Sequence, residues 1–238
     1  MAQVINTNVA SLFAGAALNK SANALQVAQQ RLSSGLRINS SKDDATGLGI
    51  AQGYDKSIRG TNVAIRNALD AISKAETNDG YAAQVQENLK RLYEIAVQLG
   101  GTATGAETTA LLAENARIAG MTTAATGVTV DGAGTMVTGV SAALATFTGV
   151  TVSAISTDIG SATTARANYG ADMARFGSAV ATMQTESVNL SASYSRIMDT
   201  DYATETTAMT RNQILQQAGI AALAQSNQNP SMVLSLLR

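Results

Sequence analysis

The chain has 238 residues, of which 45% are hydrophobic but only 4% aromatic, and its formal net charge is −1. Alanine, the best helix former, dominates the apolar residues, so the composition favours long, closely packed helices. Cysteine and histidine are absent, which excludes disulfides, zinc sites of the Cys/His kind and triads with a histidine base. No basic stripe indicates nucleic-acid binding, and no cofactor site is expected.

The N-terminal region is predicted to form an amphipathic helix followed by a linker. One helical face carries three leucines, Leu18, Leu25 and Leu32, and Val9 and Leu12 extend it toward the N-terminus. No basic region precedes a long apolar run here, so no cleaved secretory signal is expected. The Ser-, Gly- and Asp-rich stretch over 33–47 is typical of a linker.

A long helix is predicted to follow the linker and to end at Gly100-Gly101. Its later part has apolar residues at alternating spacings of four and three: Val85, Leu89, Leu92, Ala96 and Leu99. The phase of this pattern slips between about 76 and 82. We therefore expect either one helix with a local irregularity there or two helices nearly in line. A third helix is predicted over about 105–119.

The stretch from 127 to 156 has a different pattern from the helical regions. Valines and Phe147 alternate with Thr and Gly, and Asp131-Gly132 is a turn signal between two β-branched runs. A small β-hairpin region is predicted at about 127–156.

The second half of the chain contains the strongest helical pattern, over about 160–199. Nine positions follow four-three spacing through four heptads: Tyr169, Met173, Phe176, Val180, Met183, Ser187, Leu190, Tyr194 and Ile197. Such a seam is the signature of a coiled coil or a long bundle. The fold class is therefore predicted to be mainly α, a long antiparallel helical bundle or coiled coil with a small β-hairpin region.

The C-terminal segment is again amphipathic and rich in Ala, with large apolar residues that include Leu215, Leu223, Leu234 and Leu237. Isolated helices of this kind are marginal in water unless one face is packed. We expect the N- and C-terminal helices to pair with each other and then with other copies. A subunit that packs head-to-tail without closing a ring forms a helical filament. No stretch is apolar and long enough for membrane insertion.

Several long sequence motifs at both ends of the chain resemble those of bacterial flagellin. They are MAQVINTN at 1–8, RLSSGLRINS at 31–40, DYATE at 201–205, QILQQAG at 213–219 and VLSLLR at 233–238. With the word LKRLYEIAVQ at 89–98, the resemblance covers roughly the first 100 and the last 70 residues. The chain resembles a short form that lacks the outer variable domains.

The resemblance implies a two-domain arrangement. Residues 1–45 and 196–238 would form a terminal coiled-coil domain that lines the filament core. Residues 46–195 would form a rod-like domain with the β-hairpin. Family members are exported unfolded by the flagellar type III apparatus without a cleaved signal and polymerise beneath a cap. The expected function is a structural, secreted filament subunit for motility. The expected partners are other copies of the chain and the export chaperone, cap and junction proteins.

Two sets of site residues follow from the pattern and the resemblance. The subunit-packing set comprises Leu18, Leu25, Leu32, Tyr169, Phe176, Val180, Met183, Leu190, Ile197, Leu215, Leu223, Leu234 and Leu237. The resemblance also implies a contact with the vertebrate innate receptor for flagellin through Arg91, Ile95 and Glu107, although Tyr93 stands where many relatives carry a second basic residue.

Three alternatives remain open at this point. A hook–filament junction protein of the same export system would share the terminal helices but fewer of the sequence motifs given above. An enzyme would need a site in the short middle of the chain, where no phosphate-loop or zinc-protease motif is present. A membrane-active amphipathic protein is disfavoured because its helices would need a Lys/Arg-rich polar face. Lys42-Asp43-Asp44 is interpreted as solvated linker charge near a helix start, with inter-subunit salt bridges as its candidate role.

Overall fold

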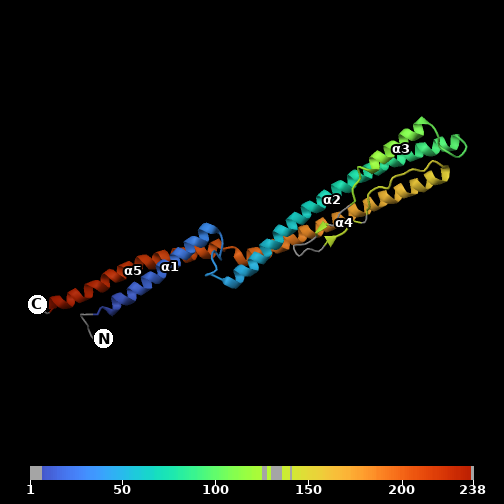
Figure 1. The fold of residues 1–238 in the computed structure, drawn as a ribbon. Helices are drawn as coiled ribbons and strands as arrows, with labels where there is room; N and C mark the ends of the chain where they lie inside the picture. Colours follow the sequence, from blue (N-terminus) through green and yellow to red (C-terminus); the bar gives the residue numbers. More distant parts are fainter. Residues whose placement is uncertain (1–6, 125–127, 130–135, 140, 237–238) are drawn as a thin grey trace. The chain divides into compact units, whose positions relative to one another are not determined.

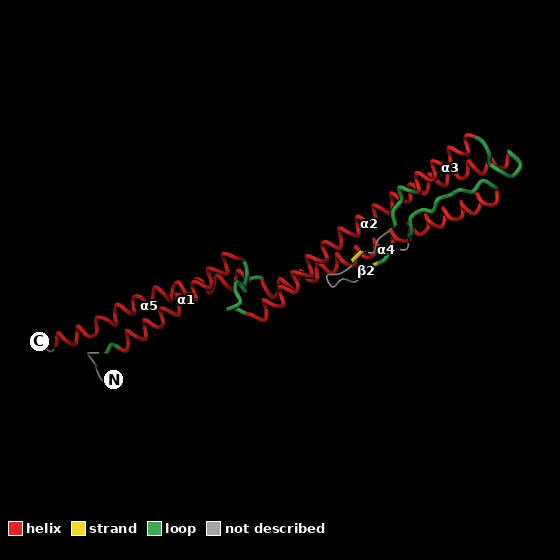
Figure 2. The backbone as a smooth tube through the Cα atoms, in the orientation of Figure 1, coloured by secondary structure: helices red, strands yellow, loops and turns green. Residues whose placement is uncertain are grey.

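The computed structural model describes all residues except 1–6, 125–127, 130–135, 140 and 237–238. Its elements are α1 (Val9–Ser34), α2 (Ala45–Gln98), α3 (Ala106–Ala119), β1 (Val128–Thr129), β2 (Met136–Val137), α4 (Val152–Met198) and α5 (Tyr202–Leu236). The chain divides into two compact units, unit 1 over 1–53 and 193–238 and unit 2 over 54–192. The mainly helical fold predicted from the composition is confirmed (Figure 2).

Unit 1 contains α1 and α5, which lie side by side along their lengths (Figure 1). α1 begins where the Asn8 side chain accepts a hydrogen bond from the Ser11 amide, and it ends at Gly35. Gly35 has a φ of 71°, the left-handed conformation that glycine adopts without strain at the end of a helix. The predicted pairing of the two terminal helices is confirmed.

The linker after α1 is tied to the junction between α4 and α5. Leu36 forms an antiparallel bridge with Asp199. The Arg37 guanidinium donates to the backbone oxygen of Ile197 through Nη2 at 2.7 Å and Nε at 3.1 Å. A cation at the last carbonyls of a helix is favourable because of the helix dipole. In the same region, Ile38 is buried in a small apolar cluster with Ala51 and Met198.

Unit 2 is built on α2 and α4, whose predicted seams face each other. One cluster combines small residues of α2, Ala64, Ala68 and Ala71, with Phe176, Val180 and Met183 of α4. A second and larger cluster contains Val85, Leu89 and Leu92 of α2 with Ile155, Ala162 and Tyr169 of α4. Alanine on α2 lets the larger side chains of α4 pack closely against its backbone.

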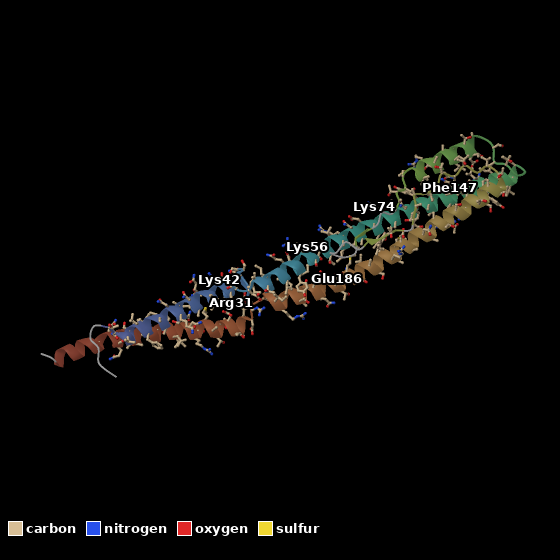
Figure 3. All side chains as sticks on the ribbon, turned by 60° about the horizontal axis from the view of Figure 1, so that its bottom comes forward. Arg31, Lys42, Lys56, Lys74, Phe147 and Glu186 are labelled. Carbon is tan, nitrogen blue, oxygen red and sulfur yellow. The ribbon has the colours of Figure 1, made fainter. Side chains whose placement is uncertain are left out.

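Helix α3 and the segment before α4 complete the larger cluster. Ile118 and Ala119 of α3 are buried in it, as are Leu144 and Phe147. Phe147 lies at the end of unit 2 that carries α3 (Figure 3). Asn88 of α2 donates to the Asn115 side chain of α3 at 2.9 Å, so α3 is held on α2 by a buried polar pair as well as by apolar contact.

The expected irregularity near 76–82 is absent, because α2 is one helix from Ala45 to Gln98. The polar residue responsible for the phase slip has its own partner. The buried Asn78 side chain donates to the backbone oxygen of Thr123 at 2.7 Å. A buried polar side chain that is hydrogen-bonded does not need to interrupt a helix. The predicted helix end at Gly100-Gly101 is confirmed.

The β-hairpin prediction is correct in type but wrong in extent. β1 pairs antiparallel with β2, with Val128 opposite Val137, and the predicted Asp131-Gly132 turn lies outside the described residues. Residues 141–150 contain no strand, and α4 already begins at Val152. The β-branched residues at 150–156 suggested a strand, but Ile155 packs in the helical core of unit 2. Tertiary packing therefore outweighs local β-propensity there.

Candidate assembly interface

The paired α1 and α5 run antiparallel. At one end of the pair, the Asn8 side-chain amide donates to the backbone oxygen of Ser226 at 2.9 Å, and the Ser226 hydroxyl donates back to Asn8 at 3.3 Å. At the other end, an Arg31 guanidinium nitrogen lies 3.6 Å from a Glu205 carboxylate oxygen. The start of α1 thus meets the later part of α5, and polar contacts at both ends fix the register.

Small residues make most of the contact between these helices. The buried residues of α1 are Ser21 and Ala28. On α5, a Cβ at Gly219 would lie 3.3 Å from the Leu18 side chain, so the glycine lets Leu18 approach the α5 backbone. Because few large side chains are buried, the pair alone gains little from the hydrophobic effect.

Large apolar side chains of both helices remain outside this pair. Phe13 of α1 is 77% exposed, and Ile214 and Ile220 of α5 are 60% and 56% exposed. We call the following set the uncovered residues of unit 1: Val9, Leu12, Phe13, Tyr202, Ile214, Leu215 and Ile220. Contiguous exposed apolar surface on a protein usually marks an interaction site.

The apolar residues of α5 are spread around the helix and do not form one stripe. Ile214 and Leu215 are consecutive and therefore point about 100° apart, and both are exposed. Apolar residues that point in several directions cannot all be covered by a single neighbouring helix. In a single chain α1 covers only one side of α5, so the helix is left incompletely buried.

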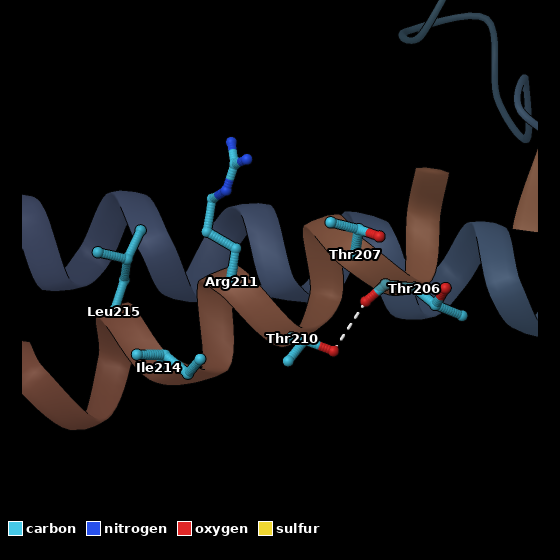
Figure 4. A pocket seen from close by; sticks show the side chains of 6 residues that line it. All are labelled: Thr206, Thr207, Thr210, Arg211, Ile214 and Leu215. Carbon is cyan, nitrogen blue, oxygen red and sulfur yellow. Dashed lines mark hydrogen bonds between the residues drawn. The ribbon is translucent and has the colours of Figure 1, made fainter. Parts of the chain in front are cut away.

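A shallow groove of about 490 Å³ runs over this exposed part of α5. It is lined by threonines, Arg211, Ile214 and Leu215, and Figure 4 shows them on one stretch of the helix. The Thr210 hydroxyl donates to the backbone oxygen of Thr206 at 2.9 Å. Such threonines present their methyl groups while their hydroxyls are bonded to the helix. The groove can therefore accept an apolar side chain.

The structure places the predicted packing residues of the two ends differently. Leu18, Leu25 and Leu32 are half-buried on α1, and Leu223 is half-buried on α5. Leu215 is half-exposed. Leu234 lies in α5, but the structure does not describe its side chain, and Leu237 lies outside the described residues.

The packing residues predicted on α4 lie mostly inside the chain's own core. Tyr169, Phe176, Val180 and Met183 are all at most 9% exposed in unit 2. Leu190 and Ile197 are half-buried, and Ile197 packs in the cluster around Met198. The buried four are occupied by contacts within one copy.

Two functional features were missed from the sequence. Phe13 lies four residues after Val9 on the same helical face, a spacing that could have revealed it. Arg37 is hydrogen-bonded to Ile197 at the end of α4, 160 positions away in the sequence. No local pattern indicates such a contact.

The acidic residues of the linker shape the start of α2. The Asp43 carboxylate accepts the Ser40 amide at 3.0 Å and the Ser40 hydroxyl at 3.1 Å, and these bonds lower the pKa of Asp43. The Asp44 carboxylate accepts the Gly47 amide at 2.8 Å. Local turn and cap contacts therefore account for both carboxylates, and inter-subunit salt bridges stay a prediction.

Two family models match the chain with this arrangement of helices. The bacterial flagellin N-terminal helical region matches residues 5–134, and the bacterial flagellin C-terminal helical region matches residues 152–237. The chain belongs to the bacterial flagellin family. The two matched regions contain the helices that pair in unit 1 and those that pack in unit 2.

Curated flagellins from Salmonella are similar to the matched part of the chain. Flagellin of Salmonella rubislaw and phase 2 flagellin of Salmonella typhimurium are each 47% identical over 130 residues, which is 51% of this chain and 26% of the relative. Flagellin of Salmonella muenchen is 54% identical over 98 residues, 41% of this chain and 19% of the relative. The chain thus spans about a quarter of the length of the curated flagellins it matches.

The word at 89–98 that resembles the flagellin receptor contact lies on α2 beside α3. Arg91 Nε donates to the Glu107 carboxylate at 2.9 Å and Nη1 donates to Glu94 at 3.1 Å. The bond to Glu107 and then that to Glu94 raise the pKa of Arg91. Arg91 and Glu107 are exposed, whereas Ile95 is only 8% exposed. Two of the three predicted residues are therefore in direct contact on the surface, and the third lies largely within the core.

The described part of the chain offers neither a metal site nor a membrane span. Within it, no group of three or more acidic side chains is placed to hold a metal ion. None of the helices described there is long and apolar enough to span a membrane.

Proposed function

We propose that this flagellin is a structural subunit that polymerises into the bacterial flagellar filament. The observation that supports it most is the incomplete burial of α5, whose apolar residues face several directions while α1 covers one side. Additional copies of the chain would cover the uncovered residues of unit 1. Both matching models describe flagellin regions, which favours the filament subunit over the hook–filament junction protein.

In the proposed filament, residues 1–45 and 196–238 line the core and residues 46–195 form the rod around it. The burial of only two small α1 residues, Ser21 and Ala28, supports this division, since such a pair needs further partners to be stable. The proposed location is extracellular, after type III export without a cleaved signal. Export chaperone, cap and junction proteins are the proposed transient partners, and the proposed role is structural and not enzymatic.

Electron microscopy of the concentrated chain tests this proposal, with long helical fibres as the expected result. Phe13→Lys places a charge on an uncovered position and should abolish fibres, because burying an unpaired charge is costly. Phe13→Leu is the matched control and should assemble. Deleting residues 205–238 should leave a chain that does not polymerise. Normal fibres from both Phe13→Lys and the truncation would contradict the proposal.

The contact between Arg91 and Glu107 favours a second proposed role, recognition by the vertebrate innate receptor for flagellin. The ion pair presents two exposed charged groups of different helices on one surface, 2.9 Å apart, with Ile95 beneath. A receptor-reporter assay should lose signal with Arg91→Ala and keep it with Lys90→Ala, since Lys90 is its exposed neighbour. Equal signals from the two variants would exclude Arg91 as a contact.

A further inference from the structure

The segment before α4 lies between the two regions that match the family models, which end at residue 134 and resume at residue 152. We call residues 141–150 the latch. They are extended, with no helix or strand of their own. Even so, two of their side chains, Leu144 and Phe147, belong to the core of unit 2. A segment outside the shared family regions therefore seals a core made by the shared helices.

The first end of the latch is bound to a buried carboxylate. The Ser141 amide and hydroxyl both donate to one oxygen of Asp172, at 2.9 and 2.5 Å. Asp172 lies on α4 and is fully buried. One turn earlier on α4, the Tyr169 hydroxyl donates to the backbone oxygen of Ala142 at 3.2 Å. A buried polar group left without its hydrogen bonds is costly, so the two bonds from Ser141 hold this end of the latch firmly.

The middle of the latch covers the apolar core. Leu144 and Phe147 are 5% and 3% exposed. The Leu144 amide donates to the Thr122 hydroxyl oxygen at 2.8 Å, and that hydroxyl donates to the backbone oxygen of Ala119 at the end of α3. Thr122 thus links the latch to the last residue of α3, while Ser141 and Ala142 are bonded to α4.

The second end of the latch is held by another carboxylate of α4. The Gly149 amide donates to Asp158 at 3.1 Å. A Cβ at Gly149 would lie 2.6 Å from that carboxylate oxygen and 3.0 Å from the backbone of Ala154. A larger residue at 149 would therefore crowd the Asp158 carboxylate and the α4 backbone and weaken this contact. Next to it, the Ala103 amide donates to the backbone oxygen of Val150 at 2.7 Å.

These bonds differ in kind from those of the helices. The amides of Ser141, Leu144 and Gly149 are bound to side chains of other elements, whereas α2 and α4 satisfy their amides internally. Detaching the latch therefore breaks no helical hydrogen bond. Local segments of this kind can open at lower free energy than the whole fold.

We propose that the latch opens and closes as one unit on an otherwise folded unit 2, and that Asp172 is the residue that holds it closed. In the closed state Leu144 and Phe147 cover the core between α3 and α4. In the open state their sites become an apolar cleft. Opening of the latch therefore exposes apolar core residues of unit 2.

Amide hydrogen exchange of the full chain, kept below its polymerisation concentration, tests this proposal. In the unaltered chain, the amides of Ser141, Leu144 and Gly149 should exchange at similar opening free energies, and faster than the α2 amide of Leu89. Asp172→Asn should speed these three amides by about tenfold or more, because the NH2 group of Asn leaves a buried donor in place of a carboxyl oxygen and weakens the Ser141 bonds. The Leu89 amide should not change. Fluorescence of an apolar dye should rise in the same variant.

Asp70→Asn makes the same substitution at an exposed position of α2 and should leave all these amides unchanged. Ser141→Ala and Gly149→Ala change residues at the two ends of the latch and no residue of a helix, and either should reproduce the effect if Asp172→Asn does not fold. The proposal is overturned if the latch amides exchange only with Leu89, or if the variants speed Leu89 by the same factor.

Discussion

Gly15 lies within α1 and Gly35 lies just after it. Of the two, only Gly35 has a backbone conformation that favours glycine. Gly15 is inside the helix, and a Cβ there would meet no atom within 4 Å. Gly35 has a φ of 71°, and a Cβ there would lie 3.1 Å from the Tyr202 hydroxyl. Gly15→Ala should therefore stabilise the chain by about 0.5–1 kcal/mol, through the lower backbone entropy of the unfolded state. Gly35→Ala should destabilise it by about 1–2 kcal/mol, because L-residues disfavour this conformation.

Urea unfolding followed by circular dichroism measures both changes. A shift of the same sign for the two alanine variants would contradict the assigned end of α1. The sequence located this end only approximately, within the Gly- and Ser-rich stretch at 33–47. The backbone at Gly35 is also held by the segment between α4 and α5, where the Thr200 amide donates to the Gly35 oxygen at 2.9 Å. A contact that joins residues so far apart in the chain leaves no local pattern.

At the scale of single elements, Asp201 supports the start of α5. Its carboxylate accepts the Thr204 hydroxyl at 2.7 Å and the Ala203 amide at 3.0 Å, and these bonds lower the pKa of Asp201 below the ordinary value of 3.8. A lowered pKa means that the carboxylate stabilises the fold fully above its ordinary pKa. This contribution is lost as the pH falls through the lowered value.

Asp201→Asn should therefore make the acid-induced loss of α5 helicity less steep below pH 4, since an amide oxygen can still cap but does not titrate. Circular dichroism between pH 7 and pH 2 measures this. Asp70→Asn serves as the control for the loss of one charge. If helicity falls as steeply with pH in Asp201→Asn as in the unaltered chain, Asp201 does not contribute to the acid response.

Helix α3 offers a second test at this scale, through the buried pair of Asn88 and Asn115. Replacing Asn115 by Ala leaves the Asn88 side-chain amide without its acceptor and should cost about 1–3 kcal/mol. The double change of Asn88 and Asn115 to Leu should cost less than the sum of the two single changes to Leu, because neither polar group then remains buried alone. Additive free energies of unfolding would mean that the two side chains do not interact.

The helices themselves were largely predictable, whereas the segments between them were not. Heptad spacing revealed the part of α4 from Tyr169 to Ile197, where the period is regular. The first turns of α4 were missed because Val152 and Ile155 are β-branched and stand among Thr and Ser. The latch was also missed, since its position depends on side-chain bonds to Asp158 and Asp172 of α4, the second of them 31 residues after Ser141.

At the scale of the whole molecule, the exposed apolar surface of unit 1 is the feature that a single chain cannot account for. Sequence periodicity predicted that both ends are amphipathic, but the apolar residues of α5 are spread around the helix, so this prediction is wrong for α5. The structure also shows which apolar residues α1 and α5 leave uncovered. Periodicity could not separate contacts within one copy from contacts between copies. Tyr169 and Phe176, which were expected in subunit packing, are used inside unit 2.

The absence of cysteine allows a direct measurement of whether other copies cover these residues. Ile220→Cys introduces a single thiol at an exposed position of α5. Its rate of reaction with a maleimide reagent is compared between unassembled chains and the polymer. If α5 is buried by neighbouring copies, the thiol should react readily before assembly and at least about tenfold more slowly in the polymer. Equal rates in the two states would contradict the central claim that assembly completes the burial of α5.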